Sequence, residues 1–326
     1  MVRKKTVRSQ TRKSRRKKQT SGFVAAVRKV FFFMVAVIVC SIVLLFMYDR
    51  FYPREKLLPE QKKETAQEEV SVAPVVSSTQ PVERVKTKES SSTYSFPAKA
   101  EIPTLKKKQT EQIIQHEGYT VSYNSDYKIA NWVAYELTDK EAKSNKNERS
   151  NKFVVDPMVK GASATNEDYT RTGYDRGHLA PAGDMKWSYK AMNESFYLSN
   201  ICPQKPGLNR GIWKDLEEQA RLWASENGSL LIVTGPVIED DLKRLGKNRV
   251  GIPRTFYKVI CTVTDGRVEG VGFLFDNKDY GETPLKSMMI PIDSVEHVTG
   301  IDFFPSLPDS IEDRMEARVN KSSWSF

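Results

Sequence analysis

The sequence feature that most constrains the fold is a run of 19 uncharged residues, Val30 to Tyr48, which reads VFFFMVAVIVCSIVLLFMY. At about 1.5 Å per residue, a helix of this length spans roughly 28 Å, which is the thickness of a bilayer's hydrocarbon core. A cleaved signal peptide is the alternative, but its apolar region usually has only about 7–15 residues and ends in a small-residue cleavage site. The sequence therefore predicts one uncleaved transmembrane helix over residues 30–48.

The charge of the chain is concentrated before this run. Residues 1–29 contain 12 of the 51 Lys and Arg residues and no Asp or Glu, which leaves 39 basic against 41 acidic residues elsewhere, a net charge of −2. Basic residues beside a first membrane helix stay on the cytoplasmic side. We therefore expect a cytoplasmic tail that contacts anionic lipid, with a nucleic-acid-binding arm as the alternative, and an extracytoplasmic remainder, periplasmic or extracellular.

Two further segments follow the predicted membrane helix. Residues 49–109 are rich in Pro, Ser, Thr, Glu and Lys, which predicts a disordered linker. Residues 110–326 combine helical and strand patterns, in this order: a short helix at 110–118, a hairpin at 119–137, a strand at 195–200, a long helix at 209–228, strands at 229–237, 255–263 and 268–275, and two short C-terminal helices. Because strands and helices do not alternate regularly, we predict one α+β domain with a mixed or antiparallel sheet.

Cysteine and histidine are too few and too scattered for a zinc site. Cys40 lies in the predicted membrane helix, and a disulfide between Cys202 and Cys261 would be permitted but is not required. The three histidines form no HExxH motif, and His116 and His297 are expected at the surface. Any metal ion must therefore be held mainly by oxygen ligands.

The stretch YDRGHLAPAGDM, residues 174–185, places Arg176 close to His178. Histidine has a usual pKa near 6.5, so at neutral pH its ring is largely uncharged and can accept a proton from water. The permanent charge of Arg176 should lower that pKa further, and its planar guanidinium matches the oxygens of a phosphate. The pair favours attack on a phosphate, with an ordinary hydrogen-bonded loop histidine as the alternative.

A metal site is expected on the helix that follows. Asn209 and Glu217 are eight residues apart, so on one helix they would share a side and stand roughly 12 Å apart along it. Mg²⁺ prefers oxygen ligands and keeps several waters, which suits one direct ligand from Asn209 and a more distant Glu217. The alternatives are a helix N-cap for Asn209 and a solvated helix face for Glu217.

Three motifs in this order, YDRGHLAPAGDM, FYLSNICPQ and LNRGIWKDLEEQAR, together resemble the DNA/RNA non-specific endonuclease family. This family is part of the ββα-metal (His-Me finger) superfamily, which includes endonuclease G, and the resemblance extends from about residue 118 to the C-terminal HVTGIDFFPSLPD. It implies a ββα-metal finger at the active site. It also implies that His178 is the general base, that Arg176 contacts the phosphate, and that Asn200 supports both the histidine and the scissile phosphate.

The resemblance implies a metal site and further substrate contacts as well. Asn209 matches the single direct Mg²⁺ ligand, and Glu217 matches the acid that orients water in the outer shell of the metal, so Glu217 counts as both a catalytic and a metal residue. Mn²⁺ is the alternative ion. Arg149, which precedes a DP pair, and Arg210 are expected to bind substrate together with Arg176.

These expectations combine into a membrane-anchored, Mg²⁺-dependent endonuclease that cuts DNA and RNA and leaves 5′-phosphate ends. One alternative is a catalytically silent nucleic-acid-binding surface module, such as a receptor for DNA uptake. Another is a phosphodiesterase for a different polyanion. Because the part of the chain after residue 29 is close to neutral, its Lys and Arg would have to gather around one cleft.

Overall fold

The computed structural model describes residues 94–326. The predicted tail, the predicted membrane helix and most of the predicted linker lie outside this range. Within it, none of the helices combines the length and the apolar character that a membrane span needs.

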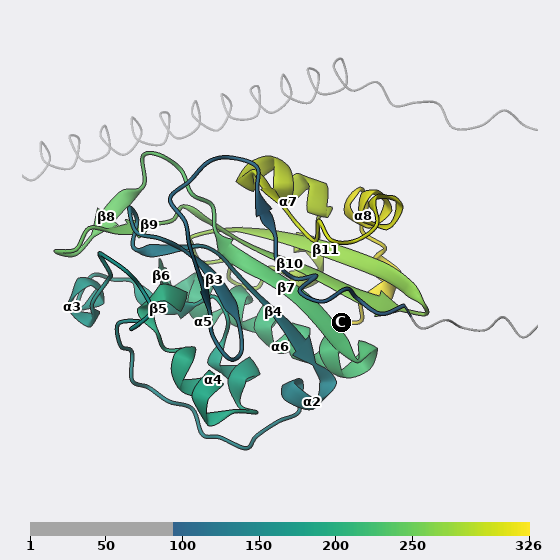
Figure 1. Cartoon of the computed structure of the whole chain (residues 1–326), viewed down its shortest axis with the longest axis horizontal. Helices are drawn as coiled ribbons and strands as arrows, with labels where there is room; N and C mark the ends of the chain where they lie inside the picture. Colours follow the sequence, from purple (N-terminus) through teal and green to yellow (C-terminus); the bar gives the residue numbers. More distant parts are fainter. Residues whose placement is uncertain (1–93) are drawn as a thin grey trace, which may run out of the picture. The chain divides into compact units, whose positions relative to one another are not determined.

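A six-stranded sheet forms the centre of the domain (Figure 1). Its strands, in spatial order, are β11 (Arg267–Asp276), β10 (Thr255–Thr264), β7 (Ser229–Pro236), β4 (Ile129–Thr138), β3 (Thr120–Asn124) and β2 (Gln112–Gln115). Every neighbouring pair is antiparallel, with Val259 opposite Val233 and Val133 opposite Thr234 in the central strands. The predicted α+β class with an antiparallel sheet is confirmed.

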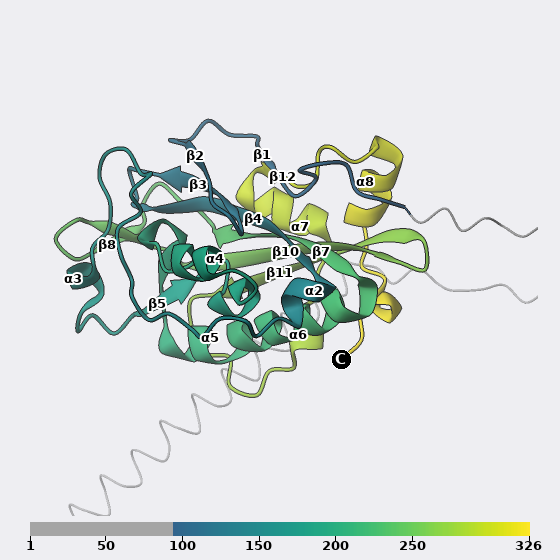
Figure 2. The same ribbon diagram turned by 60° about the horizontal axis from the view of Figure 1, so that its bottom comes forward.

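Both faces of the sheet are covered by helices. Of these, α6 (Ile212–Asn227) lies on one face, and α7 (Ile292–Thr299) and α8 (Asp309–Glu316) lie on the other (Figure 2). Because successive strand residues point to opposite faces, β10 contributes to two separate cores: Ile260 packs on the α6 side and Val259 on the α7 side.

The same alternation separates the two cysteines of the described region. Cys202 belongs to the core on the α6 side and Cys261 to the core on the α7 side, and both are free thiols. Cys202 and Cys261 therefore form no disulfide with each other, because they belong to different cores on opposite faces of the sheet.

The long helix α6 forms for the reason expected from its sequence. Its buried residues recur at helical spacing and include Trp213, Leu216, Ala220 and Trp223. The helix begins later than predicted, however, because Asn209 belongs to a separate short helix, α5 (Pro206–Arg210). Gly211 separates the two helices, and a Cβ atom at Gly211 would lie only 2.5 Å from the carbonyl oxygen of Gly207.

A second, two-stranded sheet precedes these helices. It consists of β5 (Asp175–His178) and β6 (Ile201–Gln204), which pair antiparallel with His178 opposite Ile201. Since α5 and α6 follow β6 directly, the chain has a strand–strand–helix order here. The strand predicted at 195–200 is misplaced by a few residues, because Leu198–Asn200 is a 3₁₀ turn, η2, and β6 begins after it.

The domain begins earlier than residue 110. The short strand β1 (Thr104–Leu105) pairs with β12 (Ile301–Asp302), and Ala100 is fully buried. The end of the predicted linker is therefore folded. The helix predicted at 110–118 is also wrong, because this segment forms β2, in which Ile114 is buried and Ile113 is exposed.

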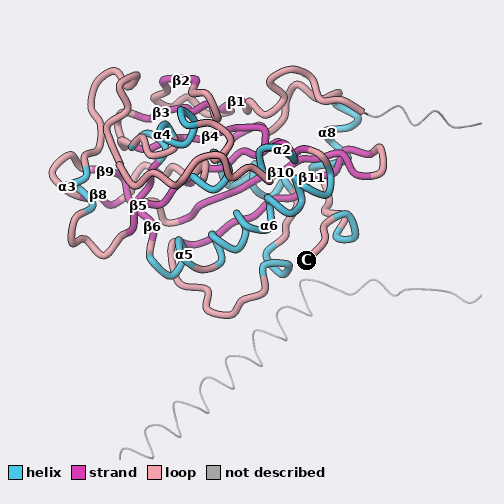
Figure 3. Tube along the Cα trace, turned by 90° about the horizontal axis from the view of Figure 1, so that it is seen from below, coloured by secondary structure: helices cyan, strands magenta, loops and turns pink. Residues whose placement is uncertain are grey.

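The remaining elements are short and are joined by loops. They are α2 (Asp139–Ala142), α3 (Asn166–Tyr169), η1 (Ala182–Met185), α4 (Tyr189–Glu194), β8 (Lys243–Leu245), β9 (Val250–Ile252), η3 (Leu285–Met288) and η4 (Lys321–Ser323). The segment between α2 and α3 contains no helix or regular strand and is drawn as loop in Figure 3. It carries Arg149 and Phe153, which both reach the candidate site.

Candidate active site

His178 is the last residue of β5 and is only 7% exposed. Its Nε2 atom is buried and has no hydrogen-bond partner among residues 94–326. The indole Nε1 of Trp213, on α6, donates to the carbonyl oxygen of His178 at 3.3 Å. This hydrogen bond ties the end of β5 to α6. The backbone of His178 is thus held in place, while its Nε2 atom is free of hydrogen bonds from the described part of the chain.

Two phenylalanine rings surround the imidazole. The centroid of Phe196 lies 4.8 Å from that of His178 in an edge-on arrangement, and the centroid of Phe153 lies at 5.4 Å. Removal of the ring from water disfavours its charged form. Burial, together with the positive charge of Arg149, lowers the pKa of His178 to about 3, so the ring is neutral at physiological pH.

The two arginines of the site lie against these same rings. Arg149 stands 5.2 Å from the centroid of Phe196, and Arg176 stands 4.5 Å from the centroid of Phe153. Arg176 is exposed and donates from Nη1 to Oδ1 of Asn166 at 2.8 Å. The arginine whose charge lowers the pKa of His178 is Arg149, which corrects the expectation that Arg176 has this effect.

Asn200 is fully buried behind the histidine. Its Oδ1 accepts from the backbone N–H of Ala180 at 2.9 Å, and its Nδ2 donates to the carbonyl oxygens of Ala180 and Ser195, both at 2.8 Å. Both amide hydrogens are therefore used within the protein. The structure places Asn200 as a support for the chain directly after His178 and leaves no amide hydrogen for the expected contact with a phosphate.

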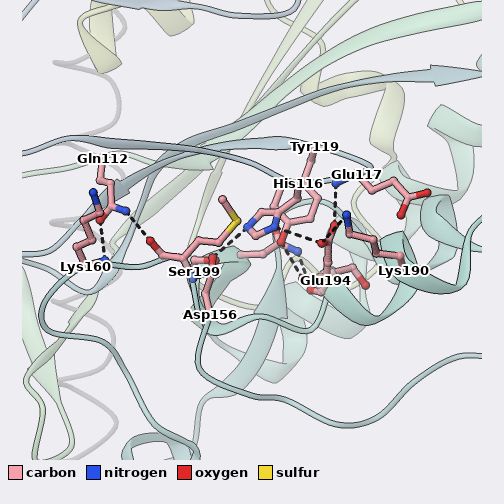
Figure 4. Close-up of polar contacts among 12 residues, drawn as sticks. Gln112, His116, Glu117, Tyr119, Asp156, Lys160, Lys190, Glu194 and Ser199 are labelled. Carbon is pink, nitrogen blue, oxygen red and sulfur yellow. Dashed lines mark hydrogen bonds and ion pairs between the residues drawn. The ribbon is translucent and has the colours of Figure 1, made fainter.

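A buried polar network supports the same turn (Figure 4). The hydroxyl of Ser199, the neighbour of Asn200, donates to Oδ2 of Asp156 at 2.6 Å, and Nε2 of His116 lies 3.0 Å from the same oxygen. His116 is thus buried rather than at the surface as expected. Asp156 belongs to the same loop as Phe153. The network therefore fixes this loop against the turn behind His178.

Asp175, at the other end of β5, gathers the residues of α5. Its Oδ2 accepts from Nδ2 of Asn209 at 3.0 Å, and its carboxylate accepts two bonds of 2.7 Å from Arg210. No hydrogen bond from a described residue reaches Oδ1 of Asn209. The N-cap alternative for Asn209 is wrong, because Gly211 precedes α6 and Lys205 precedes α5. Arg210 is exposed and forms an ion pair with Asp175. To bind substrate, Arg210 would have to do so from this paired position.

Glu217 lies partly buried on α6 and accepts no hydrogen bond from a described residue. Burial raises the pKa of Glu217, against the opposing effect of Lys258 and with a further increase from Asp184. The neighbouring Glu218 is exposed and pairs with Lys214 at 2.8 Å. The solvated-face alternative thus describes Glu218, whereas Glu217 faces the protein.

Three charged residues that were not predicted from the sequence as site residues, Lys258, Asp184 and Arg221, act on Glu217. Lys258 on β10 is 1% exposed, with its Nζ 3.5 Å from the carbonyl oxygen of Leu179, and burial lowers its pKa. Asp184 pairs with Arg221 at 2.8 Å. The signal that could have identified Lys258 is a lone lysine in the apolar strand TFYKVICTV.

The predicted site residues thus form two linked groups around β5. Arg149, Arg176 and Asn200 surround His178, while Asn209 and Arg210 surround Asp175. The charge of Arg149 acts on both His178 and Glu217, which connects α6 to the histidine.

Comparison with known proteins gives a consistent assignment. The family model described as DNA/RNA non-specific endonuclease matches residues 97–310. Mitochondrial endonuclease G of Homo sapiens is 34% identical over 209 residues, covering 60% of this chain and 70% of the relative. Nuclease 1 of Schizosaccharomyces pombe is 32% identical over 217 residues, covering 61% and 67%.

A fungal relative and a solved structure agree with this. Nuclease C1 of Cunninghamella echinulata is 32% identical over 209 residues, covering 60% of this chain and 83% of the relative. The crystal structure of an EndoG/EndoGI complex contains a chain with a TM-score of 0.58 and 31% identity, covering 62% of this chain and 89% of that one. The present chain is a nuclease and belongs to the DNA/RNA non-specific endonuclease family.

Proposed function

We propose that this chain is a membrane-anchored, Mg²⁺-dependent endonuclease that hydrolyses phosphodiester bonds of both DNA and RNA. The observation that carries the proposal is a neutral, buried His178 whose Nε2 has no hydrogen-bond partner within residues 94–326, beside two phenylalanine rings that each carry an arginine. The alternative, a catalytically silent binding module, would need the arginines but not a histidine held in its neutral form.

His178 supplies the base of the proposed reaction. Its neutral imidazole accepts a proton from the water that attacks phosphorus. Arg149 and Arg176 stand on the two aromatic rings beside the histidine, where their charges would stabilise the negative charge that grows on the phosphate oxygens. Cleavage on the 3′-oxygen side of the phosphorus gives 5′-phosphate and 3′-hydroxyl ends.

The residues present fit an oxygen-ligated ion. The amide nitrogen of Asn209 donates to Asp175, which fixes the amide and leaves its oxygen without a described donor, and the carboxylate of Glu217 likewise lacks one. Mg²⁺ prefers such ligands, and Mn²⁺ accepts the same set. The bound ion would supply positive charge at the reacting phosphate. Burial raises the pKa of Glu217, and the positive charges of Lys258 and Arg221 reduce this increase.

The cellular placement is proposed from the sequence. The apolar run at residues 30–48, preceded by a basic tail, would anchor the chain with residues 1–29 in the cytoplasm and the nuclease domain outside, in the periplasm or extracellular space. Protease treatment of cells that express the full chain, stripped of any outer membrane but with the cytoplasmic membrane intact, tests this. Digestion of the nuclease domain only after the cytoplasmic membrane is opened would contradict the proposed orientation.

The enzymatic proposal is tested by His178→Ala in the full chain, assayed on plasmid DNA and on RNA with Mg²⁺ or EDTA. We expect a loss of at least about 100-fold for the variant, as for removal of a general base, and no cleavage in EDTA. DNase activity of the variant within tenfold of the wild type would refute the role of His178. Binding of nucleic acid without Mg²⁺-dependent cleavage by the wild type would favour the silent module.

A further inference from the structure

Three carboxyl groups converge on the face of the sheet opposite the candidate active site. Asp293 and Glu296 lie one turn apart on α7, and Glu316 is the last residue of α8. One oxygen from each of the three lies within 4.8 Å of the others. The cluster therefore bridges the two helices that cover this face.

Glu316 lacks the partners that a buried carboxyl group requires. The residue is only 6% exposed, and its Oε1 atom is buried without a hydrogen-bond partner among residues 94–326. Its position at the C-terminal end of α8 gives no help, because the carbonyl end of a helix carries partial negative charge. A buried, unpartnered carboxylate facing two other carboxylates is strongly unfavourable unless a cation or a proton is added.

The nearby basic side chain does not complete the cluster. Lys106 contacts Oε2 of Glu296 at 2.7 Å and Oδ1 of Asp302 at 2.8 Å, while Oε1 of Glu296 accepts from the backbone N–H of Phe303 at 2.7 Å. In the described part of the chain, no ion pair reaches Asp293 or Glu316. The negative charge of the three carboxylates is therefore only partly compensated.

We propose that Asp293, Glu296 and Glu316 bind one Ca²⁺ ion, which links α7 to α8. A set of ligands made of carboxylate oxygens selects a hard cation. Ca²⁺ accepts several protein carboxylates in a flexible geometry, whereas Mg²⁺ gives up its waters reluctantly and is usually held by one or two carboxylates. Three carboxyl oxygens within 4.8 Å of one another can all reach one Ca²⁺ ion at the usual Ca–O distances of about 2.3–2.6 Å, with water completing its coordination.

This site is separate from the one at Asn209 and Glu217. Residues of α6 pack in the core on one face of the sheet, and residues of α7 and α8 pack in the core on the other. The Ca²⁺ ion would thus stabilise the packing of the last two helices and would take no part in phosphodiester cleavage. An ion that binds only the folded state raises the melting temperature with its concentration.

The competing explanation is a proton in place of the ion. Without a cation, the protein would protonate one carboxyl of the cluster, and stability would then not respond to Ca²⁺. The two explanations differ in this response, which makes thermal unfolding in the presence and absence of Ca²⁺ a suitable test.

The experiment compares the melting temperature of the full-length protein in EDTA and in millimolar CaCl₂. For the wild type we expect Ca²⁺ to raise it by roughly 3–5 °C, as for an ion at about ten times its dissociation constant. The increase should persist in N209A/E217Q, which lacks the proposed catalytic ligands, and in E312Q, a control at a neighbouring acid of α8 outside the cluster. It should be lost in E316Q.

A second variant and a direct measurement guard against misfolding of E316Q. Asp293 is exposed, so D293N should fold normally and bind Ca²⁺ more weakly. Titration calorimetry should give one ion per chain for the wild type and for N209A/E217Q. No Ca²⁺-dependent increase in the wild type, an increase that survives in both E316Q and D293N, or one that disappears in N209A/E217Q would each overturn the proposal.

Discussion

The guanidinium of Arg149 and the imidazole of His178 pack against the same ring, that of Phe196, at 5.2 Å and 4.8 Å from its centroid. The histidine is buried and the arginine is exposed, so a permanent charge at the surface acts on a ring that is largely removed from water. Burial and, to a smaller extent, this charge keep His178 in its neutral form, and the same contact places a phosphate-binding group beside the base. Substitution at Arg149 should therefore affect both.

Arg149→Ala should raise the pKa of His178 from its value of about 3, because the smaller of the two causes of its depression is removed while burial remains. The acid limb of the pH profile of kcat/KM should move to higher pH by the same amount, independently of any fall in its maximum. Side-chain NMR of labelled histidine checks the value directly. Arg176→Ala is the matched control, and a shift in that variant but not in Arg149→Ala would contradict the assignment.

The depressed pKa of His178 also predicts how stability depends on pH. Below the usual pKa of 6.5 the unfolded chain binds a proton at this residue and the folded chain does not, so acidification from pH 6.5 towards about 3 destabilises the fold. At about 1.4 kcal/mol per pH unit, the effect reaches at most roughly 5 kcal/mol. His178→Asn should flatten this part of the curve. Denaturant unfolding at pH 7, 5 and 4 measures the free energy of unfolding of both proteins. An equal change of this free energy with pH in the wild type and in His178→Asn would disprove the prediction.

Asn200→Ala should destabilise the domain by roughly 2–4 kcal/mol, because it removes three buried hydrogen bonds and leaves backbone groups of Ala180 and Ser195 without partners. The turnover number should also fall, since the turn that follows His178 loses its support. Asn193→Ala is the control: its one exposed bond to Tyr189 should contribute less than about 0.5 kcal/mol. Similar free energies of unfolding for the two variants would count against the role of Asn200.

Glu217 and Glu218 form a matched pair on α6 for testing the metal site. Glu217→Ala should lower Mg²⁺-dependent cleavage by about 100-fold or more and raise the Mg²⁺ concentration needed for half-maximal rate, because an oxygen ligand near the ion is lost. Glu218→Ala removes an exposed pair with Lys214 and should leave the rate within twofold. Initial rates across a Mg²⁺ titration decide between them, and equal losses would refute a specific role for Glu217.

The sequence predicted an element correctly where the pattern of apolar and polar residues within that one element was sufficient. The apolar face of α6, the alternating strands β7, β10 and β11, and the DRGH stretch were all predictable, because each depends on neighbours within a few residues. The secondary structure of short segments was harder to predict, because a run of about four residues fits a helix and a strand equally well. Residues 112–115, within the predicted helix 110–118, form the strand β2 because they pair with β3.

The sequence alone determined which chemical groups are present and which of them lie close along the chain: His178 beside Arg176, and Asn209 near Glu217. Tertiary structure decided which groups act on one another. It brought Arg149 to His178 through Phe196, placed Lys258 beneath Glu217 from a distant strand, and joined β1 to β12 at the edge of the domain. The physical reason is that burial and the distance between charges set a pKa, and both depend on contacts between segments far apart in the sequence.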